Sequence, residues 1–328
     1  MFNVKNRMTK IHKAGAAVII LFSLLAIPAP SQAASVTCST ASCLATALAN
    51  AQPGDVITLA AGVTFTGNFV AAKSGTASAK ISIKGASSTN KPILNGGSTS
   101  TGYALYITGD YYDVRNVKVT NSKKGIMLDH ANNNWIEYVD VYNIGEEGVH
   151  FRDGSSNNVI KNSSVTDTGI LNAEYGEGVY VGSDIGKWES YKKETNNNRV
   201  SYVSFGPNVR AEHVDIKEGS TGTIVENCTF NGTGISGANY ADSFIDVKGN
   251  NDIIRNNVGY RNGNSKIVDA FQVHERASGW GQNASFTGNT LYLDNAAPYV
   301  VNVDDGATAT ATSNTRSPSG NMYSGSVN

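Results

Sequence analysis

The sequence predicts an all-β protein: a right-handed parallel β-helix, or solenoid, with a short capping helix at its N-terminal end. Beyond residue 33 the chain is rich in Gly, Asn, Ser, Thr and Val, and only one segment shows helical periodicity. Short strand-like segments recur at intervals of about 22 to 35 residues, which is the range of solenoid repeats. Asn, Gly or Thr flank most copies, as is typical of turns between short strands.

Residues 1–33 have the pattern of a signal peptide. Four basic residues precede an apolar run from Ala14 to Ile27, and Ser31-Gln32-Ala33 fits a cleavage site. The apolar run is shorter than the roughly 20 residues that a membrane span needs, which argues against an anchor. We therefore expect residues 34–328 to be secreted as a single, monomeric β-helix domain that does not contact the membrane.

The charge balance argues against general nucleic-acid binding. The whole chain carries 26 Lys and Arg against 27 Asp and Glu. Removal of the four basic residues of the signal peptide leaves 22 against 27, a net charge of -5. A negative chain does not favour contact with nucleic acids or anionic membranes, but it can still carry a local basic site for an acidic substrate.

The N-terminal part of the mature chain contains the predicted cap. Helical periodicity covers Ala41 to Ala51 and stops at Pro53-Gly54, so this helix is expected to cover the open first coil. Cys38 and Cys43 lie close together, and export permits a disulfide between them, with two free thiols as the alternative. Cys228 lies in a strand pattern and is expected to be buried as a small apolar residue.

The first recurring strand type carries two apolar residues five positions apart. We expect these side chains to be buried in every coil, with the amides of the Asn-rich turns stacked beside them. Earlier strands are predicted over residues 56–59, 80–84 and 104–107. The pairs are Val114 and Val119, Ile136 and Val141, Ile160 and Val165, Val200 and Phe205, Val225 and Phe230, Ile253 and Val258, and Phe286 and Leu291.

The second strand type alternates apolar residues with polar ones. Its copies cover residues 124–129, 147–152, 177–182, 212–217, 243–248, 269–274 and 299–304. Because coils stack at about 4.8 Å, equivalent residues of successive copies should form ladders on one face. The outward positions are Met127 and Asp129, His150 and Arg152, Tyr180 and Gly182, Asp215 and Lys217, Asp246 and Lys248, Gln272 and His274, and Asn302 and Asp304.

These outward residues predict a functional cleft. Asp-x-Lys occurs twice in succession, and Gly182 leaves a gap at the centre of the ladder. Glu147, Glu177, Glu212 and Asp269 form an acidic column where the strands begin. Converging polar groups in a groove are the usual signal of a site. The alternative is a solvated face with exposed Asp–Lys pairs, each contributing under about 1 kcal/mol.

A long segment, residues 183–198, is predicted to project as a loop beside Gly182. Long loops on rigid scaffolds often carry function. Its Trp188 and Tyr191 can either stack on a sugar ring or hold the loop in place, and both interpretations stay open.

Lys217 and Lys248 are expected to stack on neighbouring coils. Their repulsion should lower the pKa of at least one of them, although Asp215 and Asp246 oppose this. A lysine that titrates near neutrality can act as a base. Either lysine can instead neutralise a carboxylate of the substrate.

The chain resembles the pectate-lyase-like β-helix proteins, and most closely the alginate lyase and chondroitinase B family. Three segments carry the resemblance: Ala-Gln-Pro-Gly-Asp-Val-Ile-Thr-Leu-Ala-Ala-Gly at 51–62, Ser-Gly-Thr-Ala-Ser-Ala-Lys-Ile-Ser-Ile-Lys-Gly at 74–85 and Pro-Ile-Leu-Asn-Gly at 92–96. The resemblance covers most of the mature chain at the level of the coil pattern. It implies a lyase that cleaves a uronic-acid polysaccharide by β-elimination.

The resemblance also implies roles for individual residues. In that family a glutamate ligand of calcium precedes the catalytic lysine by five positions, and Glu212 and Lys217 match this spacing. Lys248 stands where the family has an arginine, and Arg210 where it has a second glutamate. Glu212 and Lys217 would face opposite sides of a straight strand, so a bend must lie between them.

The resulting site prediction has three groups. The candidate catalytic residues are Lys217, Lys248, Asp215 and His274. The candidate residues for binding an acidic polysaccharide are Arg152, His150, Tyr180, Trp188, Asp246, Gln272 and Arg276. The candidate ligands of a Ca²⁺ ion are Glu212 and Glu177.

Two other functions remain open. Asp215 and Asp246 on neighbouring coils can form the carboxylate pair of a retaining glycoside hydrolase, whose carboxyls lie about 5 Å apart. The solenoid can also be a non-catalytic carbohydrate-binding or cell-surface protein, since fold does not fix function.

Overall fold

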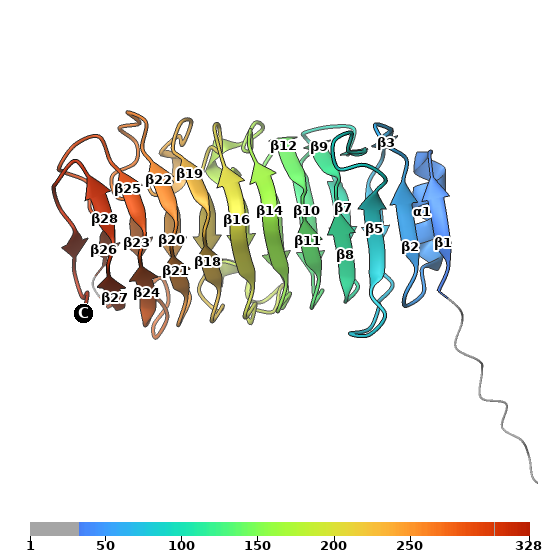
Figure 1. Ribbon diagram of the computed structural model, residues 1–328. Coiled ribbons are helices and arrows are strands. Elements are labelled where there is room, and N and C mark those ends of the chain that lie inside the picture. Colours follow the sequence, from blue (N-terminus) through green and yellow to red (C-terminus); the bar gives the residue numbers. More distant parts are fainter. Residues whose placement is uncertain (1–32, 305) are drawn as a thin grey trace, which may run out of the picture. The chain divides into compact units, whose positions relative to one another are not determined.

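The computed structural model describes residues 33–304 and 306–328, so the predicted signal peptide lies outside the described residues except for Ala33. The described chain winds into a stack of parallel coils that follow one another in sequence order (Figure 1). Among the described residues, no helix is long and apolar enough to cross a membrane.

Two sheets follow the stack. The smaller one, here called the site sheet, has ten strands in the described residues. These are β4 (Phe69–Ala71), β7 (Tyr103–Ile107), β10 (Lys124–Asp129), β13 (Val149–Arg152), β15 (Val179–Val181), β17 (Val214–Ile216), β20 (Ile245–Val247), β23 (Phe271–Val273), β26 (Val301–Val303) and β29 (Tyr323–Ser324). The seven strands from β10 to β26 correspond to the seven predicted copies of the second strand type, and all of these except β10 begin two residues later than the pattern suggested.

The larger sheet has nineteen strands in the described residues and contains the first predicted strand type. It comprises β1 (Ser35–Cys38), β2 (Val56–Leu59), β3 (Thr64–Thr66), β5 (Ile81–Gly85), β6 (Ile93–Asn95), β8 (Tyr112–Arg115), β9 (Lys118–Ser122), β11 (Trp135–Glu137), β12 (Asp140–Ile144), β14 (Val159–Val165), β16 (Arg199–Phe205), β18 (Ile224–Glu226), β19 (Thr229–Asn231), β21 (Ile253–Arg255), β22 (Val258–Tyr260), β24 (Ala284–Thr287), β25 (Thr290–Tyr292), β27 (Ala309–Thr312) and β28 (Thr315–Ser317).

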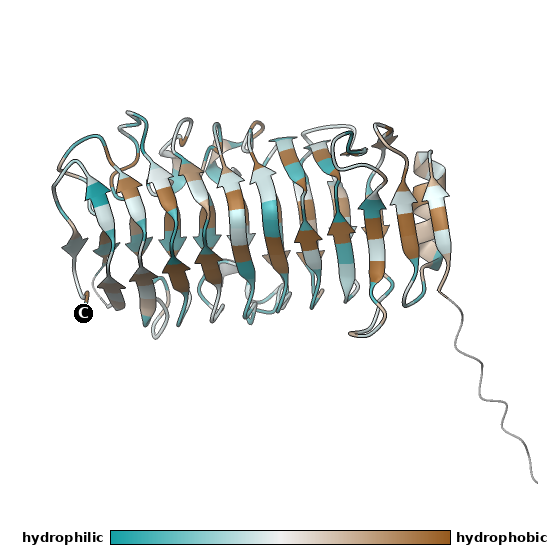
Figure 2. Ribbon diagram, viewed as in Figure 1, coloured by the Kyte–Doolittle hydropathy of each residue, from teal (hydrophilic) through white to brown (hydrophobic). Residues whose placement is uncertain are grey.

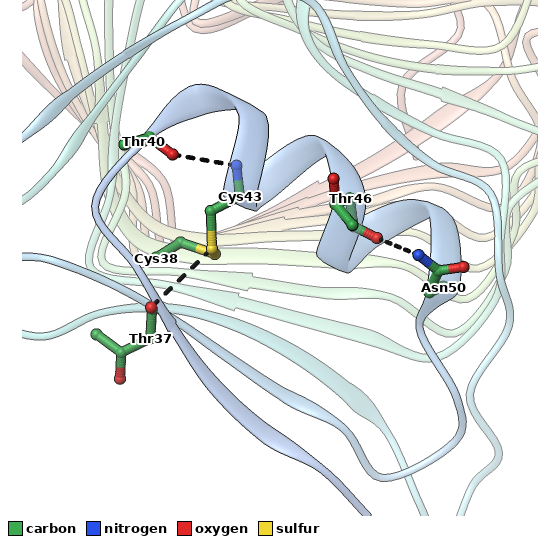
Figure 3. Close-up of a disulfide and its surroundings, with 6 residues drawn as sticks. All are labelled: Thr37, Cys38, Thr40, Cys43, Thr46 and Asn50. Carbon is green, nitrogen blue, oxygen red and sulfur yellow. Dashed lines mark hydrogen bonds between the residues drawn. A yellow bond between two sulfur atoms is a disulfide. The ribbon is translucent and has the colours of Figure 1, made fainter.

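The N-terminal end of the stack is capped as predicted. Helix α1 (Ala41–Asn50) packs against the first strands and buries Leu44 and Leu48. The Thr40 side chain accepts a hydrogen bond from the backbone N–H of Cys43 at 3.2 Å, and a disulfide joins Cys43 to Cys38 (Figure 3). Cys228 is buried and free. Both cysteine predictions are therefore confirmed.

The apolar pairs fill the interior in every coil but one. Apolar segments recur from strand to strand along the stack (Figure 2), and six of the seven pairs are buried. The prediction is wrong for Ile253 and Val258, which are half-exposed. Here the register pairs Val225 with Ile254 and Phe230 with Gly259. Gly259 packs against the Phe244 ring, which occupies the space that a larger side chain would fill.

Buried asparagines form amide ladders inside the solenoid, as the turns predicted. Asn134 donates through Nδ2 to Oδ1 of Asn158 at 3.1 Å, and Asn158 donates in the same way to Asn198 at 3.2 Å. A second ladder joins Asn257 to Asn289 at 3.0 Å and Asn289 to Asn314 at 2.9 Å. The amides also bond to backbone groups of the preceding coil, as Asn158 Nδ2 does to the carbonyl oxygen of Ala131, so that these buried polar groups do not remain without partners.

A bend precedes strand β17 of the site sheet. In the coil of β17, His213 and Val214 are both buried, so two successive residues face the interior. The His213 ring stacks at 10° to Phe230 and at 6° to Phe244. This bend brings Glu212 to the same face as Asp215 and Lys217. It provides the change of side that the spacing of Glu212 and Lys217 required.

Candidate active site

The register of the site sheet aligns the outward residues as predicted. Met127 pairs with His150, His150 with Tyr180, Tyr180 with Asp215, Asp215 with Asp246, Asp246 with Gln272, and Gln272 with Asn302. Met127 lies in this ladder but is fully covered. The alternation of the strands thus places histidine, tyrosine and carboxylate side chains in one row on one face.

A cleft with two lobes follows this row. The C-terminal lobe, about 800 Å³, includes Asp215, Asp246, Lys248, Gln272, His274 and Arg276. The N-terminal lobe, about 660 Å³, includes Lys124, His150, Arg152, Tyr180 and Tyr191. Four residues line both lobes and so mark their junction: Glu177, Asp184, Lys217 and Asn239. The cleft brings together all the predicted site residues except Trp188.

The two lysines form an ion-pair network on the cleft floor. Lys217 Nζ lies 2.8 Å from Asp215 Oδ2, and Lys248 Nζ lies 2.9 Å from Asp215 Oδ1. Lys248 also forms an ion pair with Asp246. Asp215 is thus shared between two ammonium groups from neighbouring coils.

This network overturns the prediction that repulsion lowers the pKa of a lysine. Burial favours the neutral amines, but the pKa values of Lys217 and Lys248 are both raised because Asp215 and Asp246 stabilise the ammonium forms. Burial also disfavours the ionised carboxyl of Asp215, yet the two lysines lower its pKa to about 2. Lys217 is therefore a cation in the free protein and not a ready base.

Glu177, Glu212 and Asp215 form a compact buried carboxylate cluster. One oxygen from each lies within 4.8 Å of the others. Burial and the neighbouring carboxylates raise the pKa values of Glu177 and Glu212 well above their usual range. Oε2 of Glu177 is buried and has no hydrogen-bond partner. Oxygen donors of this kind suit a hard cation, so the cluster could hold a metal ion.

Arg152 is held tightly in the N-terminal lobe. Its Nε and one terminal nitrogen each lie 2.7 Å from a carboxylate oxygen of Asp129. The guanidinium carbon lies 4.1 Å from the ring centre of Tyr191. This two-bond pair and the stacking ring fix the plane of the guanidinium, which leaves its outer edge as the part available to a ligand.

His150 supports Tyr180. One ring nitrogen, Nε2, lies 3.0 Å from the carbonyl oxygen of Gly182, and Nδ1 lies 3.4 Å from Glu147. Burial lowers the pKa of His150. Its ring centre lies 4.4 Å from that of Tyr180, and the Lys217 ammonium lies 5.2 Å from the same tyrosine ring. Tyr180 thus stands between an imidazole and a cation.

In the C-terminal lobe, His274 is surrounded by acceptors. Nδ1 lies 2.6 Å from Asp304, and Nε2 lies 3.2 Å from Gln272 and 3.4 Å from Asp246. Arg276 lies 3.7 Å from Asp184, which belongs to the long loop. The contact joins two loops that border the cleft.

Trp188 does not line either lobe, so its prediction as a substrate-binding residue is not supported. Its indole nitrogen donates to the carbonyl of Ser183 at 3.0 Å, and its ring lies edge-on to Trp280 at 6.4 Å. Lys193 lies 4.8 Å from the Trp188 ring centre. Trp188 therefore holds the loop in place, while Tyr191 of the same loop faces the N-terminal lobe.

The sequence did not point to the opposite wall of the cleft. Tyr175 lines the N-terminal lobe, Tyr240 lines the C-terminal lobe, and Asn239 lines both. These residues lie in two short helical segments between strands, which lack the strand alternation from which the ladders were inferred. The presence of aromatic residues in a Gly-rich segment between two strands is the one signal that could have marked Tyr240.

Comparison with known proteins agrees with this architecture. The family model "Pel9A-like, right handed beta helix region" matches residues 27–178, and "Right handed beta helix region" matches residues 103–291. A search among curated proteins gives no significant match.

Among solved structures, an alginate lyase from Paenibacillus sp. str. FPU-7 is 62% identical, with a TM-score of 0.89 over 90% of this chain and 99% of that one. Pectate lyase Pel9A is 20% identical, with a TM-score of 0.67 over 86% of this chain and 72% of that one. A rhamnogalacturonan lyase is 14% identical, with a TM-score of 0.62 over 84% and 78%. The last two share the fold. The predicted right-handed β-helix and its resemblance are confirmed, and the chain belongs to the β-helix polysaccharide lyase family that includes the Paenibacillus alginate lyase.

Proposed function

We propose that the protein cleaves a uronic-acid polysaccharide by β-elimination, with alginate as the first candidate substrate. The observation that carries this proposal is the place of Lys217, whose side chain lies at the junction of the two lobes beside Tyr180. A polymer that follows the cleft passes over this point. The 62% identity with an alginate lyase supports the choice of substrate.

The proposed chemistry divides two proton transfers between Lys217 and Tyr180. The phenolate of Tyr180 removes the proton from C5 of a uronate, and the electrons of that bond form the C4–C5 double bond. The bond between C4 and its oxygen breaks, and the Lys217 ammonium protonates the departing oxygen. A proton moving from Tyr180 to Lys217 restores the starting state.

The cations of the cleft floor stabilise the intermediate in this scheme. A uronate carboxylate becomes enolate-like as C5 loses its proton, so positive groups fixed in advance lower the barrier. The Lys217 ammonium carries three N–H bonds, and Asp215 accepts one of them, so the other two remain available for the substrate. Lys248, which contacts two carboxylates, acts in this account as the counter-ion that keeps the floor neutral.

We further propose that Glu177, Glu212 and Asp215 bind Ca²⁺. A bound Ca²⁺ ion would supply positive charge for a substrate carboxylate. The ion would also offset the repulsion among the three carboxylates. Because the pKa values of Glu177 and Glu212 are raised, binding of the ion would release protons from these two glutamates.

The glycoside hydrolase alternative based on Asp215 and Asp246 is less well supported. The two residues pair across neighbouring coils, but the Lys248 ammonium contacts both of them. With its pKa lowered to about 2, Asp215 cannot supply the proton that the leaving oxygen needs.

We also propose that residues 1–33 direct export, and that residues 34–328 act outside the cell as one monomeric domain. The basic and apolar pattern before Ala33 supports this. Sequencing the N-terminus of the exported protein would give Ala34 as the first residue, whereas retention of Met1 would contradict the proposal.

A panel of polysaccharides tests the activity. Alginate, pectate and a neutral glucan would be incubated with the purified protein while ultraviolet absorbance follows the new double bond. The proposal predicts an increase with alginate and none with the neutral polymer. A constant absorbance with every uronate polymer would overturn it.

A further inference from the structure

Two exposed tyrosines stand on one wall of the cleft. Tyr175 ends the short helix η1 (Ala173–Tyr175), and Tyr240 ends η3 (Ala238–Tyr240). The two short helices contact each other, although 65 positions separate the tyrosines in the sequence. Tyr175 lines the N-terminal lobe and Tyr240 the C-terminal lobe, so each lobe receives one aromatic ring from this wall.

Both rings are left in contact with solvent. Tyr175 is 46% exposed and Tyr240 is 86% exposed, the largest value among the exposed large hydrophobic residues of the described chain. Aromatic rings dominate burial energetics in cores and interfaces, so rings left open in a cleft are available to a ligand.

The backbone holds Tyr240 in an unusual conformation. Its φ is 63°, and the φ of the preceding Asn239 is 52°. A left-handed conformation is uncommon for a bulky residue and costs energy that must be offset elsewhere. Tyr202 has a similar φ outside the cleft, so it is the place of Tyr240 at the C-terminal lobe, and not its φ alone, that makes the ring available to a ligand.

Lys217 lies between the two tyrosine positions along the cleft. It lines both lobes, as does Asn239, which comes directly before Tyr240. The sugar unit that reacts at Lys217 therefore has one aromatic ring available on each side of it.

Building on the proposed function, we propose that Tyr175 and Tyr240 bind pyranose rings of the substrate on the two sides of the bond that is cleaved. The C–H groups of a pyranose face carry partial positive charge, which favours contact with the negative face of an aromatic ring. The carboxylates of the same sugar units remain free to meet the cations of the cleft floor. A polymer held on both sides of Lys217 is cut within its length and not only at its end.

The inference is tested with Tyr175→Ala and Tyr240→Ala, separately and together, and with Tyr202→Ala as the matched control. Tyr202 is 58% exposed and has a φ of 53°, but it lies on β16 and does not line either lobe. Steady-state kinetics on alginate would give KM and kcat for each variant. Binding of alginate would be measured in the Lys217→Ala background, where turnover is not needed.

Each cleft variant should raise KM about three- to tenfold with kcat within twofold of the wild type, and Tyr240→Trp should restore KM. The Tyr202→Ala control should leave both constants unchanged. An unchanged KM in both single variants, or an equal rise in the control, would overturn the inference. Loss of alginate binding in the tyrosine variants of a protein without lyase activity would keep the inference and reject the proposed reaction.

Discussion

The ammonium group of Lys217 lies 2.8 Å from Oδ2 of Asp215, two positions earlier on the same coil, and both side chains line the cleft. The pair has two effects. It keeps Lys217 protonated, since the carboxylate raises the lysine pKa above its usual value despite burial. It also fixes the cation beside the Tyr180 ring, where the proposed reaction needs it.

Replacement of Lys217 should abolish turnover without unfolding the protein. Lys217→Ala removes one of the two cations of Asp215, while Lys248 remains, so we expect the free energy of unfolding to fall by about 1–3 kcal/mol, less than the 3–5 kcal/mol for a carboxylate left unpaired. Lys217→Arg retains the charge but cannot transfer a proton, and kcat should fall by at least about 100-fold. Substantial activity in Lys217→Arg would show that the charge alone is used.

The Tyr180→Phe variant, which lacks only the phenolic oxygen, tests the proposed role of Tyr180 as the base. Tyr180→Phe retains the ring that packs against His150, so folding should be unchanged while kcat falls by about 10²- to 10⁴-fold. Burial and the charges of Asp215 and Glu177 raise the pKa of Tyr180 well above its usual value. Because the reactive form is the phenolate, kcat/KM of the wild type should rise as pH increases from neutral. A profile that falls over this range would count against Tyr180 as the base.

Asp252 makes stability depend on pH. It takes the place of an asparagine in the first amide ladder and accepts a hydrogen bond from the Thr223 N–H at 2.7 Å, while Oδ2 is buried without a partner. Burial raises its pKa well above the usual value, so the folded state keeps a proton that the unfolded chain loses. This contribution is complete below about pH 4 and is lost as pH rises through the folded pKa.

Asp252→Asn should therefore stabilise the fold by about 1–3 kcal/mol at pH 8 and have little effect at pH 4. Urea denaturation at the two pH values measures the difference. The reverse change in the same ladder, Asn158→Asp, is the matched control and should destabilise at pH 8. If Asp252→Asn changed the free energy of unfolding equally at both pH values, the Asp252 carboxyl would not be the origin of the pH dependence.

Calcium should raise the melting temperature through the carboxylate cluster. Binding to the folded state alone stabilises it according to the ratio of free ion to Kd. Glu177→Gln and Glu212→Gln remove one charged ligand each and should reduce the shift, as measured by thermal denaturation with Ca²⁺ or with EDTA. The same shift in wild type and both variants would place the ion elsewhere.

Much of this arrangement could be predicted because a β-helix repeats its register. The period of two within each strand placed Tyr180, Asp215 and Asp246 in one row, and the stacking of coils made neighbours of residues about 30 positions apart. The one error in the core, at Ile253 and Val258, arose because a glycine replaces the expected apolar residue. The sequence pattern does not reveal a shift of one position in the strand register where two adjacent residues, such as Ile253 and Ile254, are both apolar.

The features that escaped prediction depend on contacts outside the regular ladders. The raised pKa of Lys217 results from Asp215 approaching both lysines, and sequence spacing alone does not give these distances. The sequence left two roles open for Trp188, and the choice between them depends on Trp280, far away in the sequence, which packs against it. Tyr240 lines the cleft from a segment with left-handed backbone angles, and a periodic sequence pattern does not predict such angles.

The mass of the oligosaccharides released from alginate tests the central claim most directly. Elimination leaves a C4–C5 double bond at each new non-reducing end and adds no water, whereas hydrolysis adds one water molecule for every bond cleaved. The account predicts products that are lighter by one water than the hydrolysis products of equal length, formed by the wild type and not by Lys217→Ala. Products that carry the added water, or intact alginate after prolonged incubation with the wild type, would contradict it.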